Sequence, residues 1–337
     1  MKAREGDFVE TRNGSLFDVK GLVHPPKRVV AFIRYFPDER GERKRNGTSY
    51  GKVYSFSERY ELLMRSYQGY LVYDHAFDET LCEVPDSDIC RRYDPVERMI
   101  QLRNCRNLNS LEEMTLRLAE RIKERSKIPW NAIGISGSVL VNLHKNGSDI
   151  DPIVYGSGNC KKVHLAMKEM LKEPGSLFNP YSVDELRALF GFRSKDTSMS
   201  FQQFLRTESK KACQGKFMGT DYFVRFIKDW EEVDEKYGDI QYKNVGHAKI
   251  HAVVADDSES IFTPCKYVIR DVTFVEGSGL ELVREVASFR GRFCDQARKG
   301  DSIVAQGKVE RVMNKKEGGE YLRLLIGNER SDYMVVV

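Results

Sequence analysis

The hydrophobic pattern near the N-terminus predicts a small domain that is rich in β-structure. Apolar runs lie on both sides of the pair Asn13-Gly14, and an Asn-Gly pair between two such runs is typical of a β-hairpin. A continuous run of β-branched and aromatic residues at 29–36 indicates a buried strand, and residues 57–67 have a helical pattern. We therefore expect an α+β domain over residues 1–95.

A charged segment at 38–47 interrupts this domain. It carries both signs of charge and two glycines, which predicts an exposed loop or hairpin tip. Its basic side chains would also suit an arm that contacts phosphate. We favour the surface turn, because runs of charge mostly decorate solvated loops.

Extended and helical patterns alternate through the middle of the chain and predict a mixed sheet with helices over residues 96–258. Ser110 and Glu113 have the spacing of a capping box. The apolar residues that follow at three- and four-residue intervals form one helix face, which ends before Pro129. The other expected elements are strands at 132–135, 148–155, 222–227, 239–242 and 249–254, and helices that begin at 139 and cover 160–171 and 201–213.

The last part of the chain, 259–337, changes to short apolar runs that are separated by glycines. Strands at intervals of roughly 8–12 residues with such turns are typical of a small barrel. The predicted fold class is therefore α+β, with a central mixed sheet, an N-terminal α+β unit and a C-terminal barrel-like unit. We expect the two outer units to select the partner on which the central unit acts.

Composition narrows the classes of protein. Of the 337 residues, 41% are hydrophobic and 31% are charged, which suits buried cores and excludes a disordered chain. Lysine and arginine number 54 against 50 acidic residues, for a net charge of +4. Any anion-binding surface must therefore be local.

Location follows from segments that the sequence lacks. No apolar run approaches the roughly 20 residues of a membrane span, and the first residues contain no apolar signal segment. The seven cysteines are scattered and form no Cys-x-x-Cys pair. We expect reduced thiols, a cytoplasmic location and no membrane partner.

The candidate chemistry begins at Ser136-Gly137-Ser138, between a predicted strand and a predicted helix. Small residues at such a turn let backbone N–H groups approach a ligand, and a helix N-terminus favours phosphate. Asp149 and Asp151 follow on the next predicted strand, where residues two apart point to one face. Two converging carboxylates suit a hard divalent cation such as Mg²⁺. Together these parts predict metal-assisted phosphoryl or nucleotidyl transfer.

At these residues the chain resembles the polymerase-β-type nucleotidyltransferase superfamily, and more broadly a group of uncharacterised archaeal proteins described as predicted nucleotidyltransferases. Gly137-Ser138 matches the Gly-Ser turn of the superfamily, and the run from Ser148 to Asp151 matches its Asp-apolar-Asp strand. The resemblance implies a nucleotidyltransferase-type central sheet that binds a nucleoside triphosphate at Ser136, Gly137, Ser138 and Ser148. It further implies catalytic Asp149 and Asp151, which would hold two Mg²⁺ ions.

Two positions depart from the pattern of the superfamily. Its members usually carry a third carboxylate on a later strand, where this sequence offers Arg225 or His251, and carboxylates only at strand ends, at Asp221, Asp256 and Asp257. Pro152 follows Asp151 directly and removes an N–H from the predicted central strand.

These departures keep a second hypothesis open, a non-catalytic nucleotide- or RNA-binding protein with the same fold. Basic residues from Arg290 to Lys299 in the predicted barrel would suit RNA, as an acceptor or as a bound partner. They also suit an ordinary solvated barrel edge, which we favour.

Overall fold

The computed structural model describes residues 2–195, 199–277 and 283–337. It is a mixed α+β structure that divides into two compact units. The first unit comprises residues 1–74, 79–179 and 214–237, and the second comprises 75–78, 180–213 and 238–337. The first unit therefore contains both the N-terminal sheet and the segment with the predicted chemistry, while the boundaries drawn from the sequence stay a prediction.

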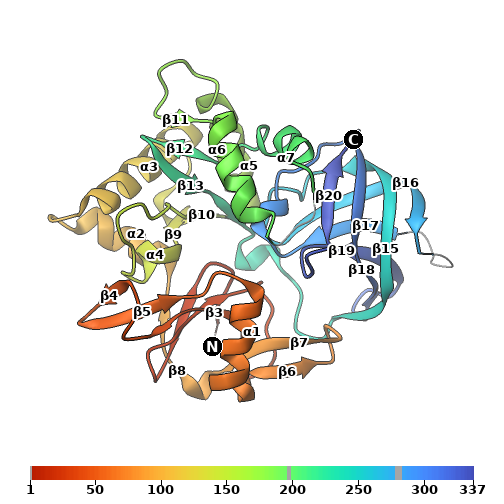
Figure 1. Cartoon of the computed structure of the whole chain (residues 1–337), viewed down its shortest axis with the longest axis horizontal. Coiled ribbons are helices and arrows are strands. Elements are labelled where there is room, and N and C mark those ends of the chain that lie inside the picture. The colour runs from red at the N-terminus through yellow and green to blue at the C-terminus, as the bar shows by residue number, and fades with distance from the viewer. Residues whose placement is uncertain (1, 196–198, 278–282) are drawn as a thin grey trace. The chain divides into compact units, whose positions relative to one another are not determined.

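An eight-stranded sheet forms the N-terminal part of the first unit (Figure 1). The strand order is β4-β5-β3-β2-β1-β8, and β7 pairs with both β3 and β6. The predicted hairpin and the predicted strand at 29–36 are both confirmed. The elements are β1 (Phe8–Thr11), β2 (Leu16–Val19), β3 (Arg28–Pro37), β4 (Arg43–Arg45), β5 (Thr48–Lys52), α1 (Phe56–Ser66), β6 (Leu71–Asp74), β7 (Glu79–Pro85) and β8 (Ile89–Tyr93).

The two faces of this sheet pack against different partners. One face carries Val9, Phe17 and Ile33 and is covered by Leu62 and Leu63 of α1. The other face packs against the segment that begins at the Ser136-Gly137 turn; its buried cluster joins Phe8, Leu16, Tyr35 and Tyr50 to Leu140, Val141 and Leu143. This second contact places the N-terminal sheet against the segment that carries the predicted site residues.

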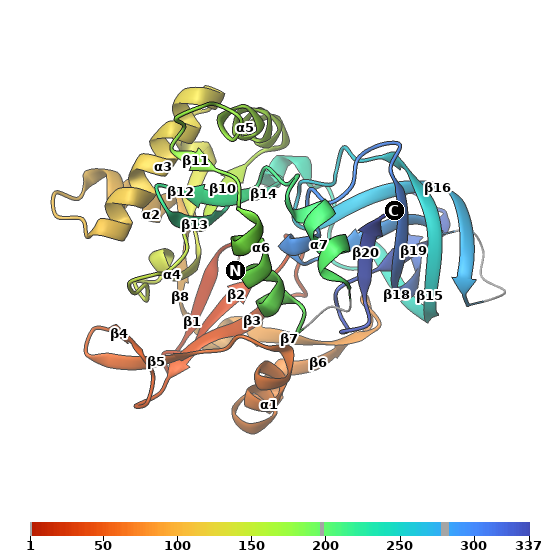
Figure 2. The same ribbon diagram turned by 45° about the horizontal axis from the view of Figure 1, so that its top comes forward.

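The segment 38–47 is not a free loop throughout. Its residues 46–47 are an exposed hairpin tip, as predicted, but the prediction of a solvated turn is wrong for residues 43–45. Residues 43–45 form β4 and pair with β5 (Figure 2). Arg43 is only 7% exposed. Its guanidinium lies 5.6 Å from the centre of the Tyr35 ring and donates to the Leu143 carbonyl. A buried arginine in a charged run is thus part of the packing.

The segment with the predicted site residues belongs to a three-stranded sheet, whose strand order is β14-β10-β9. β9 runs antiparallel to β10, and β14 runs parallel to it. Helix α3 packs against α5 beside this sheet. The elements are α2 (Pro95–Asn104), α3 (Ser110–Ser126), β9 (Ile133–Ile135), α4 (Gly137–Leu140), β10 (Pro152–Tyr155), α5 (Ser157–Met170), β11 (Phe178–Asn179), β12 (Gln214–Phe217), β13 (Thr220–Phe223) and β14 (Arg225–Ile227).

Two boundaries differ from the prediction in this segment. The helix cap is Asn109, whose side chain accepts from Glu112 N, and not Ser110 with Glu113. Both pairs have the required spacing, and an asparagine caps a helix as well as a serine does. The predicted strand at 148–155 begins only at Pro152, which resolves the position of that proline, since the first residue of a strand tolerates a missing N–H.

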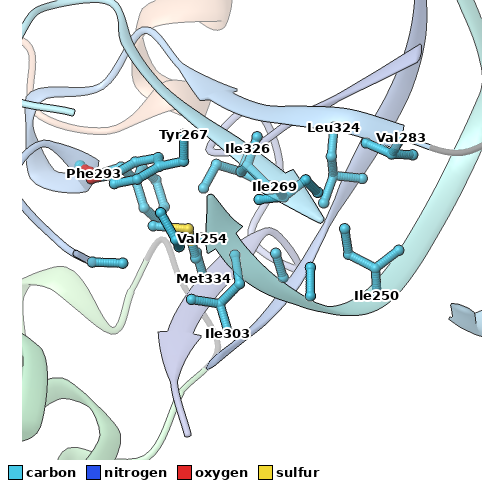
Figure 3. Packing of buried hydrophobic residues seen from close by; sticks show 14 of the residues in the cluster. Ile250, Val254, Tyr267, Ile269, Val283, Phe293, Ile303, Leu324, Ile326 and Met334 are labelled. Atoms are coloured by element: carbon cyan, nitrogen blue, oxygen red, sulfur yellow. The ribbon is translucent and has the colours of Figure 1, made fainter. Parts of the chain in front are cut away.

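In its described residues, the second unit contains the α-helices α6 and α7 and a strongly curved sheet with antiparallel and parallel pairs (Figure 1). Its strands pair in the order β15-β16-β17-β19-β18-β20, and β15 also pairs with β18, so the sheet is barrel-like as predicted. Aliphatic and aromatic side chains such as Ile250, Tyr267 and Leu324 fill its interior (Figure 3). The elements are α6 (Val183–Arg193), α7 (Phe201–Glu208), β15 (Ile240–Asp256), β16 (Cys265–Glu276), β17 (Val283–Ser288), β18 (Ser302–Asn314), β19 (Glu320–Leu325) and β20 (Tyr333–Val336).

Two predictions for this unit are wrong in detail. The strands predicted at 239–242 and 249–254 are one long strand, β15, because the polar residues between them also pair with β18. The helix predicted at 201–213 ends at Glu208. Among the described residues, no helix has the length and apolar character that a membrane crossing requires.

A buried carboxyl group in the first unit makes stability depend on pH. Asp7 is fully buried; Arg4 N donates to its Oδ2 at 3.1 Å, and Arg92 lies 3.4 Å from the same oxygen. Burial outweighs these partners and raises the pKa of Asp7 to about 7. Between its ordinary pKa and this value, the folded state binds a proton that the unfolded state releases, so the free energy of unfolding falls as pH rises through that window.

We predict that Asp7→Asn removes this loss. Its free energy of unfolding in urea should exceed that of the wild type at pH 8 by roughly 2–4 kcal/mol and should match it at pH 4. Glu39→Gln, which changes an exposed carboxylate, serves as the control. An equal pH dependence in wild type and Asp7→Asn would show that Asp7 is not the titrating group.

Candidate active site

Asp149 and Asp151 lie at the start of β10, on either side of Ile150. Ile150 forms a parallel bridge with Tyr222: its N–H donates to the Asp221 carbonyl at 2.9 Å, and its carbonyl accepts from Phe223 N at 3.0 Å. The backbone is therefore extended and held at Ile150, between the two aspartates. Asp149 is exposed and Asp151 is half-buried. The pair thus lies at the solvent-accessible edge of the site and not within a regular strand.

The turn that precedes α4 approaches the Asp151 carboxylate closely. A Cβ atom added to Gly137 would lie 1.9 Å from Asp151 Oδ2, and the φ of Gly137 is +61°. Ser136 N donates to the Asp151 carbonyl at 2.9 Å. Only glycine fits this backbone conformation and this contact without strain. The structure therefore brings together the two motifs that the sequence analysis singled out.

The three serines of these motifs have different surroundings. Ser136 is 1% exposed, and its Oγ donates to the Gly6 carbonyl at 2.7 Å. Ser138 is 3% exposed, and its Oγ has no hydrogen-bond partner among the residues that the structure describes. Ser148 Oγ accepts from Lys145 N at 3.0 Å. The Ser136 side chain thus stabilises the turn, whereas the Ser138 hydroxyl makes no hydrogen bond within the described residues.

Ser148 also lines a pocket of about 350 Å³ at the beginning of the aspartate segment. The walls come from the first turns of α3, from the turn before Asp149 and from the β12–β13 hairpin. Two lysines and three hydroxyl-bearing residues give the pocket a polar, partly basic lining. The lining residues are Ser110, Leu111, Met114, Lys145, Asn146, Gly147, Ser148, Lys216, Gly219, Thr220 and Asp221.

Basic side chains surround the acid pair. Burial, and then repulsion by Asp149, raise the pKa of Asp151 to about 7, while Arg225, Lys52 and Arg34 act in the opposite direction. Burial, and then Arg34, lower the pKa of Lys52 to about 8, and both aspartates oppose that shift. Charges of both signs therefore share one half-buried site.

Arg225 lies on β14 in register with Ile153 of β10. Its Nη1 donates to Glu5 Oε1 at 3.0 Å and lies 3.7 Å from Asp18 Oδ1. Glu5 is 1% exposed. These two carboxylates fix the guanidinium beside the acid pair, on the strand where the resemblance leads us to expect a third carboxylate.

Of the other candidates for that carboxylate, Asp221 belongs to the first unit, and its backbone carbonyl accepts from Ile150 N. Asp221 pairs with Lys216 at 3.2 Å, and His251, Asp256 and Asp257 belong to the second unit. Across the described parts of the chain, no three His, Cys, Asp or Glu side chains are grouped so that they could hold a metal.

The sequence analysis did not find Arg34 or Lys52. Nothing in the local pattern marks them, because their role depends on how the N-terminal sheet packs against residues 140–143. Arg225 was identified as a departure from the superfamily, but its partners Glu5 and Asp18 lie more than 200 residues away in the chain.

The fold and site define a mixed α+β protein in which an acidic pair and fixed cations share one site. The chain is 33% identical, over 99% of its length and 98% of the relative's, to the uncharacterised protein MJ1086 of Methanocaldococcus jannaschii. The chain belongs to the family of this archaeal protein. No protein-family profile matches it, and no solved structure does.

Proposed function

We propose that this protein is a Mg²⁺-dependent nucleotidyltransferase, which moves a nucleoside monophosphate from a nucleoside triphosphate to a hydroxyl acceptor. One observation carries the proposal: the Gly137 turn meets the Asp151 carboxylate beside Asp149, with cationic side chains around the pair. The antiparallel and parallel neighbours of β10 are compatible with a nucleotidyltransferase-type central sheet.

The acid pair fits a divalent cation chemically. Two neighbouring carboxylates that repel each other are stabilised when a cation lies between them. Mg²⁺ prefers oxygen ligands and keeps places for water and phosphate oxygens. Asp149 and Asp151 would hold it, and the ion would supply positive charge against the phosphates.

The proposed reaction is an in-line displacement at the α-phosphorus. The acceptor oxygen forms a bond to that phosphorus, the bond from the phosphorus to the pyrophosphate oxygen breaks, and the hydroxyl proton is released to water. Arg225 and Lys52 would bind the phosphates and offset the charge that moves onto pyrophosphate. The pocket beside Ser148 offers space for part of the nucleotide or the acceptor.

A transfer assay tests this proposal. The protein should be incubated with each NTP, labelled at the α-phosphate, with Mg²⁺ and total RNA or small hydroxyl compounds, and the products separated. We expect label on an acceptor together with release of pyrophosphate, and neither in EDTA.

The second candidate is a non-catalytic nucleotide- or RNA-binding protein. It is favoured by the lack, in the described residues, of a third carboxylate grouped with the pair. Tight, Mg²⁺-dependent NTP binding without label transfer to any acceptor would support this alternative. RNA binding through the barrel-like unit and a cytoplasmic location stay predictions.

A further inference from the structure

Three basic side chains act on the acid pair. Arg34, Lys52 and Arg225 all act on Asp151 electrostatically, and they come from β3, β5 and β14. Arg34 Nη1 donates to the Val53 carbonyl at 3.2 Å, and Lys52 Nζ lies 4.9 Å from the centre of the Tyr54 ring. Among the residues that the structure describes, neither side chain lies within ion-pair distance of a carboxylate. Two cations without such partners at one half-buried site favour an anionic ligand.

The backbone of the N-terminal sheet directs these side chains to the site. Leu16 pairs with Tyr35 and Phe17 pairs with Ile33, so Arg34 is the extra residue of a β-bulge. Bulges redirect side chains and are frequent beside active sites. Lys52 is paired directly with Tyr35, so its side chain leaves the sheet on the same face as that ring. Tyr35 in turn belongs to the cluster that packs against residues 140–143.

Arg225 differs from the other two because it is fixed. Glu5 and Asp18 hold the guanidinium on the strand next to the aspartates. Lys20 also contacts both of these carboxylates, at 3.2 and 2.7 Å, so the network stays in place without a ligand. Because the fixed side chain at this position is a guanidinium and not a carboxylate, it offers no oxygen ligand to a second divalent cation.

The helix dipole of α4 contributes little to the binding of phosphate at the turn before it. Helix α4 has only four residues, and a macrodipole needs a longer row of aligned peptide units. The positive charge available to a polyphosphate therefore comes mainly from side chains.

We propose that the acid pair binds a single divalent cation, and that Arg225, together with Arg34 and Lys52 of the N-terminal sheet, takes the place of the second cation against the polyphosphate. The inference rests on the proposed function. It makes the N-terminal sheet a part of the nucleotide site rather than a separate selector of the acceptor.

Counting bound Mn²⁺ tests the stoichiometry. The full-length protein, saturated with an ATP analogue that cannot transfer its nucleotide, is titrated with Mn²⁺ while electron paramagnetic resonance reports the free ion. We expect one tightly bound Mn²⁺ per chain. Two per chain would overturn the single-cation inference and leave the proposed function standing. No bound Mn²⁺ would overturn the proposed function itself.

Tripolyphosphate tests the cations without any chemistry. Its affinity for the Mg²⁺-loaded protein, measured by calorimetry, should fall at least tenfold in Lys52→Met and in Arg34→Met, and should recover in Lys52→Arg. Lys44→Met is the matched control, because Lys44 is exposed on neighbouring β4. Thermal unfolding of each variant shows whether it is folded. Unchanged affinity in both folded methionine variants, or an equal loss in Lys44→Met, would overturn the assignment of these cations.

Discussion

Replacing both Asp149 and Asp151 by alanine is expected to abolish Mg²⁺-dependent binding of nucleoside triphosphate and any transfer from it. The reason is that, in the described part of the chain, no other carboxylates are grouped with this pair to hold the ion. Loss of the two carboxylate ligands should weaken binding of the Mg²⁺ complex by at least about 100-fold. Calorimetry with NTP, in Mg²⁺ and in EDTA, measures the effect. Unchanged Mg²⁺-dependent binding would refute the assignment of the site.

The same substitutions should not destabilise the fold. The raised pKa of Asp151 means that its charged form opposes folding at neutral pH, so we expect the double variant to unfold at an equal or higher urea concentration than the wild type. Asp221→Asn is the control, since Asp221 is exposed and paired with Lys216. Lower stability in the double variant alone would mean that the pair is structural.

Replacing charged residues of a functional site often stabilises an enzyme. Like charges that are held together raise the free energy of the folded protein, and a bound ligand of opposite charge removes that repulsion. Here two negative charges are held at the start of one strand, and Arg34 and Lys52, which have no ion-pair partner among the described residues, lie on the N-terminal sheet. Each set is more favourable with a bound ion or phosphate than without it. That arrangement connects the electrostatics of the site to its proposed ligands.

Sequence patterns were sufficient for the elements that local interactions determine. The Asn13-Gly14 hairpin, the helices on both sides of β9 and β10, and the meeting of Gly137 with Asp151 all follow from residues close together in the chain. The helix cap was missed by one residue, because Asn109 and Ser110 are both good caps in consecutive positions.

The basic half of the site could not be predicted in this way. It depends on the bulge at Arg34, on the pairing of Lys52 with Tyr35, and on the packing of that face against the segment after α4. Register and packing of distant segments leave no periodic signal, since they are fixed only when the sheet is assembled. Arg43 illustrates the same limit: it lies in a run of charge but is buried by a contact 100 residues along the chain.

Gly137→Ala is expected to damage the site through a single added methyl group. Real Cβ atoms do not approach other heavy atoms to 1.9 Å, so the Asp151 carboxylate must rotate away or the turn must move. Alanine also disfavours the φ of +61°, at a cost of about 1–2 kcal/mol. We expect at least a tenfold weaker affinity for Mn²⁺ and a loss of roughly 2–4 kcal/mol in the free energy of unfolding.

The control for this variant is Gly47→Ala in the turn between β4 and β5. Gly47 has a φ of +81° and no heavy atom within 4 Å of an added Cβ, so alanine there tests the backbone conformation alone. It should lose about 1–2 kcal/mol of stability and keep the Mn²⁺ affinity of the wild type. Because both variants share the backbone cost, the difference between them isolates the contact with Asp151. Equal effects on stability and on Mn²⁺ affinity would show that the carboxylate does not depend on the turn, and the two motifs would then be neighbours without a shared site.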